Sequence, residues 1–251
     1  MLLIRIILLT LLGSFASLAG AIFLVLSKKK WTHDFTLKIT GYAAGVLLAT
    51  AFLDLLPEAL EEMEKSGGAA MIFMPVFLAI VLFFFLERTL LWFHHHHGAH
   101  DVKPTVWMIT VGDSLHNFID GVGIAAACMV NPVLGLTTAL AVGAHEIPQE
   151  IADATVMLGE GLSKTKTIVF NILSALVSLL GAVAMFYFAA VFQQYLGFII
   201  AFTGGMFMYI SLSDLIPELH HAHGKDQSIL HAFTFLGGIL TVYIIKLFIQ
   251  A

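Results

Sequence analysis

Long apolar stretches separated by short polar breaks follow one another along this chain of 251 residues. A stretch of about 20 apolar residues is long enough to cross a bilayer as a helix. The pattern predicts an all-α integral membrane protein with a single transmembrane domain over residues 1–251. We expect eight membrane-spanning helices, at residues 2–26, 39–61, 69–93, 105–129, 133–159, 165–190, 195–219 and 229–250.

The composition supports a membrane protein. Charged residues make up 12% of the chain and hydrophobic residues 59%, whereas soluble domains carry about 25% charged residues. No basic stripe runs along the sequence, so we expect no nucleic-acid partner. The single cysteine, Cys128, excludes an internal disulfide and a zinc site built from several thiolates.

The first apolar stretch has two interpretations. Arg5 and the small residues at 16–21 are typical of a secretory signal peptide with a cleavage site. The apolar run continues to Leu26, however, and ends at three lysines, residues 28–30. We therefore favour a first helix that is retained in the membrane.

Positive charges predict the orientation. Nine of the twelve Lys and Arg residues lie in the first, third, fifth and seventh predicted loops, and the other three are Arg5, Lys65 and Lys246. Because cytoplasmic loops are enriched in Lys and Arg, we expect these loops in the cytoplasm and both termini outside. The predicted location is the cell membrane, with a histidine-rich cytoplasmic loop at 94–104.

Two segments of the first three predicted helices recur in the last three. The sequence Asp-Leu-Leu-Pro-Glu at 54–58 matches Asp-Leu-Ile-Pro-Glu at 214–218, an offset of 160, and residues 17–21 match 178–182 at an offset of 161. The paired helices would cross the membrane in opposite directions. This pattern predicts an inverted repeat, in a three, two, three arrangement around a central pair of helices, as in many secondary transporters.

Candidate metal ligands concentrate in the central pair, the fourth and fifth predicted helices. Spacings of three and four residues place such side chains on one face of a helix. Imidazole, carboxylate and amide oxygen together suit a divalent transition metal, and ionisable groups at mid-membrane depth usually mark a functional pathway. The candidate ligands are His116, Asn117 and Asp120 on the fourth helix and His145, Glu146 and Gln149 on the fifth.

Further acids extend this pathway. Asp113, Glu150 and Asp153 lie in the same two helices, whose central parts contain no Lys or Arg. Buried carboxylates without a cationic neighbour need a proton, water or a mobile cation. We also expect Pro148 to interrupt the backbone hydrogen bonds of the fifth helix.

The repeated Asp-x-x-Pro-Glu elements are expected at the two mouths of the pathway. Asp54 and Glu58 would lie at the outer mouth, and Asp214 and Glu218 at the inner one. The alternative is that each Pro-Glu pair merely ends a helix. The histidines at 94–97, 100, 220, 221 and 223 lie in or at predicted cytoplasmic loops. Such tracts bind metal weakly, and a solvated loop without a fixed function is the alternative.

These motifs together resemble the ZIP family of divalent metal transporters. They are His-Asn-Phe-x-Asp-Gly at 116–121, His-Glu-x-Pro-x-Glu at 145–150 and the two Asp-Leu-x-Pro-Glu elements. The resemblance covers essentially the whole chain. It is closest to the subfamily whose fifth-helix motif reads His-Glu-x-Pro-His-Glu, where this chain has Gln149 in place of the second histidine.

The resemblance implies a transporter with a two-metal centre between the fourth and fifth helices. It implies metal uptake into the cytoplasm, an elevator-like movement of the helices that carry the site, and often a homodimer in the lipid bilayer. Zn²⁺ is favoured as the substrate, with Fe²⁺, Mn²⁺ and Cd²⁺ as alternatives. The implied ligands are His116, Asp120, His145 and Glu146 for the first metal and Asn117, Asp120, Glu146 and Gln149 for the second, with Asn171 as a further ligand.

An intramembrane zinc metalloprotease is the enzyme alternative. His145 and Glu146 open a motif similar to His-Glu-x-x-His, in which two histidines hold zinc and the glutamate is the base. Position 149 is glutamine rather than histidine, and Pro148 lies within the helix that would align the pair. We therefore expect that the chain is not an enzyme.

Overall fold

The computed structural model describes residues 1–26, 33–65, 68–93, 104–220 and 225–250. These residues form helices and no strands. The helices are α1 (Leu2–Leu26), α2 (His33–Ala49), α3 (Leu56–Lys65), α4 (Phe73–Phe93), α5 (Pro104–Val130), α6 (Pro132–Gly159), α7 (Lys164–Tyr187), α8 (Ala189–Phe192), α9 (Leu196–Tyr209), α10 (Ile216–His220) and α11 (Lys225–Gln250). Short 3-10 turns, η2 (Ala69–Met71) and η3 (Gln193–Tyr195), precede α4 and α9.

The predicted all-α fold class is confirmed. Among the described residues, five helical segments are long and apolar enough to cross a membrane: Phe35–Lys65, Ala69–Thr89, Lys164–Tyr187, Ala189–Leu219 and Ile229–Leu247. Polar side chains lower the hydropathy of α5 and α6, which are not among the five. The eight-span arrangement in three, two and three helices stays a prediction. Most of the histidine-rich loop, residues 94–103, together with His221 and His223, lies outside the described residues.

Large apolar side chains cover the outer faces of the helices. On α4, Phe73 is 76% exposed and Phe77 60%, and on α11, Phe233 is 64% exposed. A soluble protein rarely leaves contiguous apolar surface in water, whereas lipid tails solvate such faces well. The exposed surface is therefore that of a helical membrane protein.

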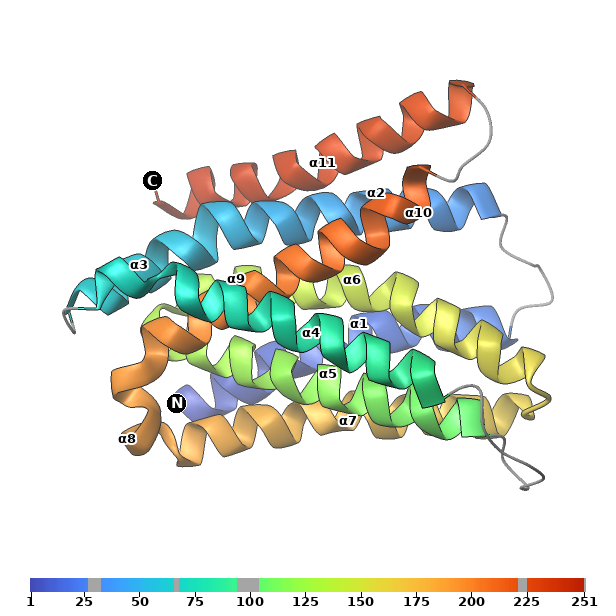
Figure 1. Cartoon of the computed structure of the whole chain (residues 1–251), viewed down its shortest axis with the longest axis horizontal. Coiled ribbons are helices and arrows are strands. Elements are labelled where there is room, and N and C mark those ends of the chain that lie inside the picture. The colour runs from blue at the N-terminus through green and yellow to red at the C-terminus, as the bar shows by residue number, and fades with distance from the viewer. Residues whose placement is uncertain (27–32, 66–67, 94–103, 221–224, 251) are drawn as a thin grey trace.

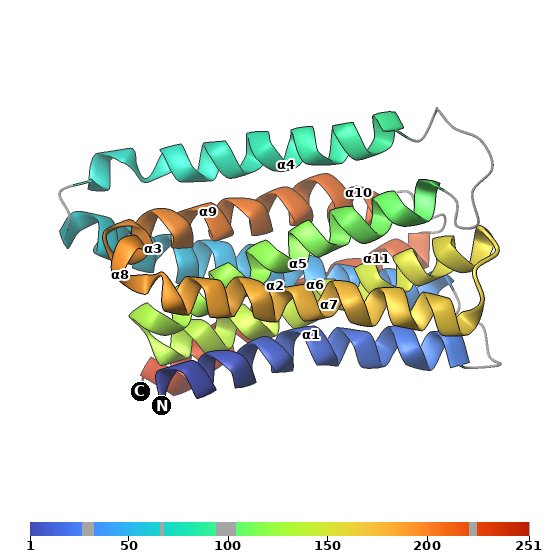
Figure 2. The same ribbon diagram turned by 90° about the horizontal axis from the view of Figure 1, so that it is seen from below.

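The helices lie side by side, and α1 begins at the same end of the bundle at which α11 ends (Figures 1 and 2). One group contains α5 and α6, with α7 packed on α5 and α1 packed on α6 and α7. A second group contains α2 packed on α11 and α4 packed on α9. The groups meet where α2 faces α6 and α9 faces α5.

Glycines allow the closest helix contacts within each group. A Cβ atom at Gly121 of α5 would overlap the backbone of Ser178 on α7, and one at Gly181 of α7 would overlap the backbone of Phe118 on α5. The α5–α7 contact is therefore a close backbone approach that larger residues would prevent.

Each repeated Asp-x-x-Pro-Glu element begins in a π-helical turn. The turn η1 (Thr50–Leu55) joins α2 to α3, and η4 (Ile210–Leu215) joins α9 to α10. The chain stays helical through Pro57 to Lys65, so the first Pro-Glu pair does not end a helix, whereas Pro217 and Glu218 lie in the last turn of α10 (Ile216–His220). Single π turns inside helices are frequent at functional sites. The two elements thus share a backbone conformation as well as a sequence.

Pro148 lacks the N–H group for one backbone hydrogen bond, as expected, but it does not break the helix. The helix α6 runs without interruption from Pro132 to Gly159, with Pro148 inside it. A proline removes one backbone hydrogen bond, and packing against neighbouring helices tolerates this loss in a membrane helix. At its start, Asn131 accepts a hydrogen bond from the backbone N–H of Val133 at 2.9 Å, which caps α6 directly after α5.

Candidate metal centre

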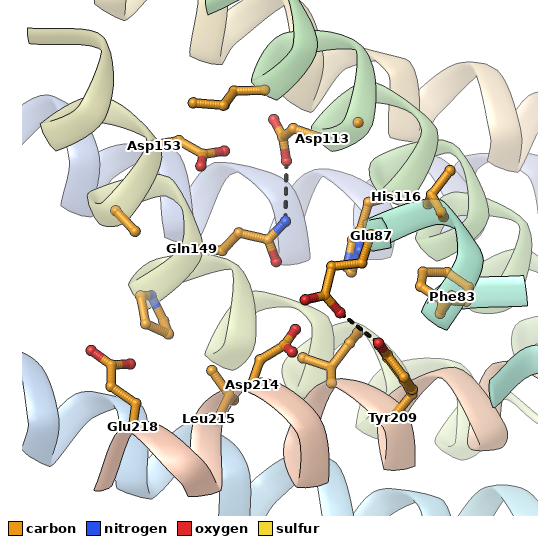
Figure 3. A pocket seen from close by; sticks show the side chains of 16 residues that line it. Phe83, Glu87, Asp113, His116, Gln149, Asp153, Tyr209, Asp214, Leu215 and Glu218 are labelled. Atoms are coloured by element: carbon orange, nitrogen blue, oxygen red, sulfur yellow. Dashed lines mark hydrogen bonds between the residues drawn. The ribbon is translucent and has the colours of Figure 1, made fainter. Parts of the chain in front are cut away.

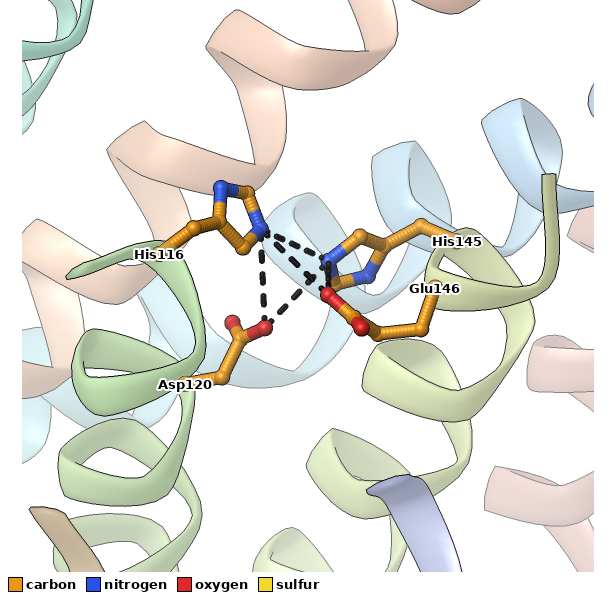
Figure 4. A group of neighbouring side chains, drawn as sticks. All are labelled: His116, Asp120, His145 and Glu146. Carbon is orange, nitrogen blue, oxygen red and sulfur yellow. Dashed lines mark hydrogen bonds and ion pairs between the residues drawn. The ribbon is translucent and has the colours of Figure 1, made fainter. Parts of the chain in front are cut away.

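Four predicted ligands come together between α5 and α6 (Figure 4). One ligand atom from each of His116, Asp120, His145 and Glu146 lies within 4.8 Å of the others. The Nε2 atoms of the two histidines are 3.1 Å apart. Asp120 Oδ2 lies 3.5 Å from His116 Nε2 and 3.4 Å from His145 Nε2, and Glu146 Oε1 lies 3.8 Å and 3.7 Å from the same two atoms.

These distances match the dimensions of a tetrahedral metal site. Bonds of about 2.0–2.2 Å from zinc to nitrogen or oxygen place the ligand atoms of a tetrahedron about 3.3–3.6 Å apart. The distances between the histidine Nε2 atoms and their partners span 3.1–3.8 Å. One ion therefore fits between the four side chains with only small adjustments.

Burial leaves the carboxylates of this group without solvation. Asp120 and Glu146 are fully buried, and no hydrogen bond within the described residues reaches any of their four carboxylate oxygens. Two dehydrated carboxylates beside one another repel and lack solvation, which costs several kcal/mol. A bound divalent cation removes both penalties at once.

The histidines are held in orientations that suit metal binding. His145 Nδ1 is 3.1 Å from the carbonyl oxygen of Ala141, one turn earlier on α6. If Nδ1 carries the proton and donates to that carbonyl, the lone pair of Nε2 faces the cluster. The ring of His116 packs edge-on against Phe83 at 5.8 Å, and the ring of His145 against Phe207 at 5.6 Å.

The other predicted ligands have different neighbours. Asn117 Nδ2 donates to Asp113 Oδ1 at 3.1 Å, and Gln149 Nε2 donates to the same oxygen at 3.4 Å. Asp113 therefore joins the two amide side chains beside the four-residue cluster. Asn171 is buried on α7, and the described contacts do not connect it to the cluster. A second metal stays a prediction.

A pocket of about 400 Å³ extends from His116 toward the end of α10 (Figure 3). It is lined by both acids predicted at the inner mouth, Asp214 and Glu218, and by two of the three further acids of the pathway, Asp113 and Asp153. Glu150 is 1% exposed and does not line it. The polar lining residues are Glu87, Asp113, His116, Gln149, Asp153, Tyr209, Asp214 and Glu218.

A second, smaller pocket of about 110 Å³ lies where α3 meets the start of α6. Asp54 and Glu58 both line this pocket. The repeat predicts that these two acids lie together at one mouth of the pathway. The same pocket contains Glu61, Thr137 of α6 and Lys246 of α11.

Three polar residues of these pockets were missed from the sequence. The hydroxyl group of Tyr209 donates to the carboxylate of Glu87, and Lys246 Nζ lies 3.3 Å from Asp54 Oδ1. Neither Glu87 nor Lys246 belongs to a motif. The repeat offset was the available signal, because 87 + 160 is 247, one residue from Lys246.

Comparison with known proteins adds independent evidence. The profile of a family described as ZIP Zinc transporter matches residues 2–104 and 94–246. The chain is 34% identical over 154 residues to zinc transporter ZIP10 of Danio rerio, and 36% over 151 residues to metal cation symporter ZIP14 of Xenopus tropicalis. It is 36% identical over 126 residues to zinc transporter ZIP6 of Homo sapiens.

These matches cover 59%, 59% and 50% of this chain, respectively. They cover 18%, 32% and 17% of the relatives' own length. The chain thus spans less than a third of each of these three relatives.

Proposed function

Because this chain belongs to the ZIP zinc transporter family, we propose that it carries divalent transition-metal ions across a membrane. The observation that supports this most strongly is the buried group of two imidazoles and two carboxylates between α5 and α6. The ZIP family consists of transporters, so the expectation that the chain is not an enzyme is confirmed. The protease alternative is abandoned.

The chemistry of the four side chains favours zinc. Two imidazole nitrogens and two carboxylate oxygens at tetrahedral spacing are a common zinc environment. Fe²⁺, Mn²⁺ and Cd²⁺ also accept mixed nitrogen and oxygen ligands, so we propose zinc as the main substrate and these three as competitors. Gln149 supplies a neutral amide where an imidazole would bind zinc more strongly, which weakens discrimination at this position.

A second ion would bind beside the first. Asp120 and Glu146 each have a second carboxylate oxygen that could bridge two ions. Asn117 Oδ1 is buried and has no hydrogen-bond partner within the described residues, and Gln149 would turn its amide oxygen inward by releasing Asp113. We propose Asn171 as a further ligand that approaches after a rearrangement of α7.

The proposed route runs from the Asp54 pocket, through the metal centre, to the pocket that ends at Glu218. The larger pocket includes His116, whereas the smaller one is separated from His145 by about two turns of α6. This difference supports a conformation in which the centre communicates with the Asp214 side. The distribution of Lys and Arg supports a cytoplasmic location for that side, and hence metal uptake across the cell membrane with both termini outside.

Movement of one helix group against the other would alternate access to the two mouths. The group of α1, α5, α6 and α7 carries all four ligands and is joined by close contacts such as Gly121 with Ser178. The group of α2, α4, α9 and α11 supplies both π-helical turns. We propose an elevator-like displacement between these groups, and a homodimer formed through the second group.

Metal uptake by the purified protein in liposomes tests this function. The parent should accumulate zinc in a saturable way, and an excess of Cd²⁺, Fe²⁺ or Mn²⁺ should reduce zinc uptake. Glu64→Gln, which removes an exposed acid on α3, is a matched control for variants that remove a buried acid. Liposomes with the parent that accumulate no more zinc than empty liposomes would contradict the proposal.

A further inference from the structure

Each π-helical turn carries an aspartate at the equivalent position. The side chain beside this aspartate is positively charged at one turn and negatively charged at the other. Asp54 of η1 lies 3.3 Å from Lys246 Nζ, which also donates a hydrogen bond to the carbonyl oxygen of Leu53. At the other turn, Asp214 shares its pocket with Glu87 of α4, which accepts a hydrogen bond from Tyr209. One mouth thus contains a lysine and the other an additional glutamate.

Lys246 and Glu87 occupy nearly equivalent positions in the repeat, one residue apart in register. Lys246 lies on α11, which packs on α2, and Glu87 lies on α4, which packs on α9. Their sequence separation is 246 − 87, or 159, against an offset of 160 for the two Asp-x-x-Pro-Glu elements. The two mouths are therefore related by the repeat but differ in charge, with Lys246 at one and Glu87 at the other.

The backbone explains why a cation is held at Asp54. Pro57 has no N–H group, so the carbonyl of Leu53, four residues earlier, lacks its usual helical donor. The ammonium group of Lys246 supplies that donor and pairs with Asp54 in the same position. The side chain of Lys246 is 27% exposed, so its flexible stem can move the ammonium group back to water.

Asp54 retains the capacity to bind a second cation. The residue is 9% exposed, and within the described residues its Oδ2 has no hydrogen-bond partner. A buried carboxylate oxygen without a partner is costly. The lysine therefore neutralises the charge of Asp54 without satisfying both of its oxygens.

The Asp54 pocket is aligned with the metal centre. Asp54 and Thr137 line the same pocket, and residues 137, 141 and 145 follow one another at helical spacing on α6. Eight residues of helix rise about 12 Å, so His145 lies about two turns beyond this pocket on the same side of α6. Ala141, between them, is fully buried, so an ion that entered at Asp54 would reach His145 only after the helix groups move.

We propose that the ammonium group of Lys246 is a built-in competitor for the incoming metal at this mouth. This inference rests on the proposed function. The lysine occupies Asp54 when no metal is present, and a divalent ion must displace it before moving to His145. At the other mouth, Glu87 adds negative charge beside Asp214, so no cation of the protein opposes the metal there within the described residues. Lys246 thus determines the apparent affinity for the metal and disfavours monovalent ions, which compete less well with an ammonium group.

The test is the concentration dependence of zinc uptake in liposomes. Lys246→Gln removes the charge and keeps an N–H donor for the carbonyl of Leu53. It should lower the KM for zinc by about two- to fivefold, the range expected for loss of one partly exposed ion pair. The matched control is Lys65→Gln, which removes another lysine paired with a glutamate, Glu62 on α3, and should leave the KM unchanged. An unchanged or raised KM in folded Lys246→Gln would overturn the inference.

A second pair of variants tests the same coupling if Lys246→Gln alone folds poorly. Asp54→Asn leaves the lysine without its carboxylate and should raise the KM by about threefold or more. Adding Lys246→Gln to Asp54→Asn should then leave the KM close to that of Asp54→Asn alone, because the lysine has lost the carboxylate through which it acts. Additive effects in this cycle would overturn the inference. A parent that shows no zinc uptake would instead overturn the proposed function, and this inference with it.

Discussion

Asp120 and Glu146 are two buried acids that lie beside two histidines. Each is fully buried, and each has one carboxylate oxygen within 3.8 Å of both histidine Nε2 atoms. A histidine alone is a frequent helix contact, but two imidazoles beside two unsolvated carboxylates are side chains of the types that bind zinc in proteins. The same reasoning gives Gln149 a different role, because its amide group contacts Asp113.

Removing one of these carboxylates should abolish transport without unfolding the protein. Asp120→Asn and Glu146→Gln keep the size of each side chain and remove an ionisable group that would bind the cation. We expect zinc uptake in liposomes to fall by at least about tenfold, with a melting temperature equal to or above that of the parent. Near-parental uptake by either variant, at equal amounts of inserted protein, would show that the cluster is not the transport site.

Replacing Gln149 should change the choice of metal. Gln149→His introduces an imidazole beside the cluster, and imidazole favours zinc over manganese. The ratio of zinc to manganese uptake should increase, while the maximal rate stays measurable. The amide of Gln149 would have no contact with the metal if this ratio is the same in the variant and the parent.

At the scale of elements, α5 and α7 pack closely because glycines permit their backbones to touch. Gly121 lies against Ser178 and Ala182, whereas Gly237 on α11 has no atom within 4 Å of an added Cβ. Comparing substitutions at Gly121 and Gly237 therefore separates the effect of a close helix contact on stability from the effect that any glycine has inside a helix.

A pair of glycine variants tests this contact. Gly121→Ala should lower the melting temperature, since forcing a methyl group into a tight contact costs about 1–3 kcal/mol. Gly237→Ala should leave it unchanged or raise it, because alanine is favoured over glycine inside a helix by up to about 1 kcal/mol. Thermal unfolding of both purified variants in the same detergent measures the difference. Equal shifts in the two variants would argue against a close α5–α7 contact.

The sequence was sufficient for features that depend on residues near one another in the chain. Ligand pairs such as His116 with Asp120 share a helix turn, and the apolar stretches specify the helices. The orientation of Gln149 toward Asp113 and the pairing of Lys246 with Asp54 depend on contacts between distant helices, which no local spacing reveals. The π-helical turns were also missed, because a proline in a hydrophobic segment is compatible with a break, a kink or an uninterrupted helix, as Pro57 and Pro148 illustrate.

At the scale of the whole molecule, the two mouths are related by the repeat and differ in charge. The pocket at Asp214 reaches the metal centre, and the pocket at Asp54 is smaller and contains a lysine. If the two repeats are inverted, these mouths face opposite sides of the membrane.

Labelling from one side tests this inverted arrangement. Glu58→Cys and Glu218→Cys, each with Cys128 replaced by alanine, provide single thiols at the two mouths. An impermeant thiol reagent added to right-side-out vesicles should modify position 58 and leave position 218 unmodified. Permeabilised vesicles are the control and should show both thiols modified. The reverse pattern, or modification of both from one side, would contradict the proposed orientation.

The central claim is that His116 and His145 bind the transported metal. X-ray absorption at the zinc edge tests it most directly, using protein loaded with one equivalent of zinc and serines in place of the histidines at 94–97, 100, 220, 221 and 223. We expect two imidazole ligands and additional oxygen ligands at about 2.0–2.2 Å, and loss of the imidazole signal in the variant that combines His116→Ala with His145→Ala. An imidazole signal that is unchanged in this double variant would show that these two histidines do not bind the metal.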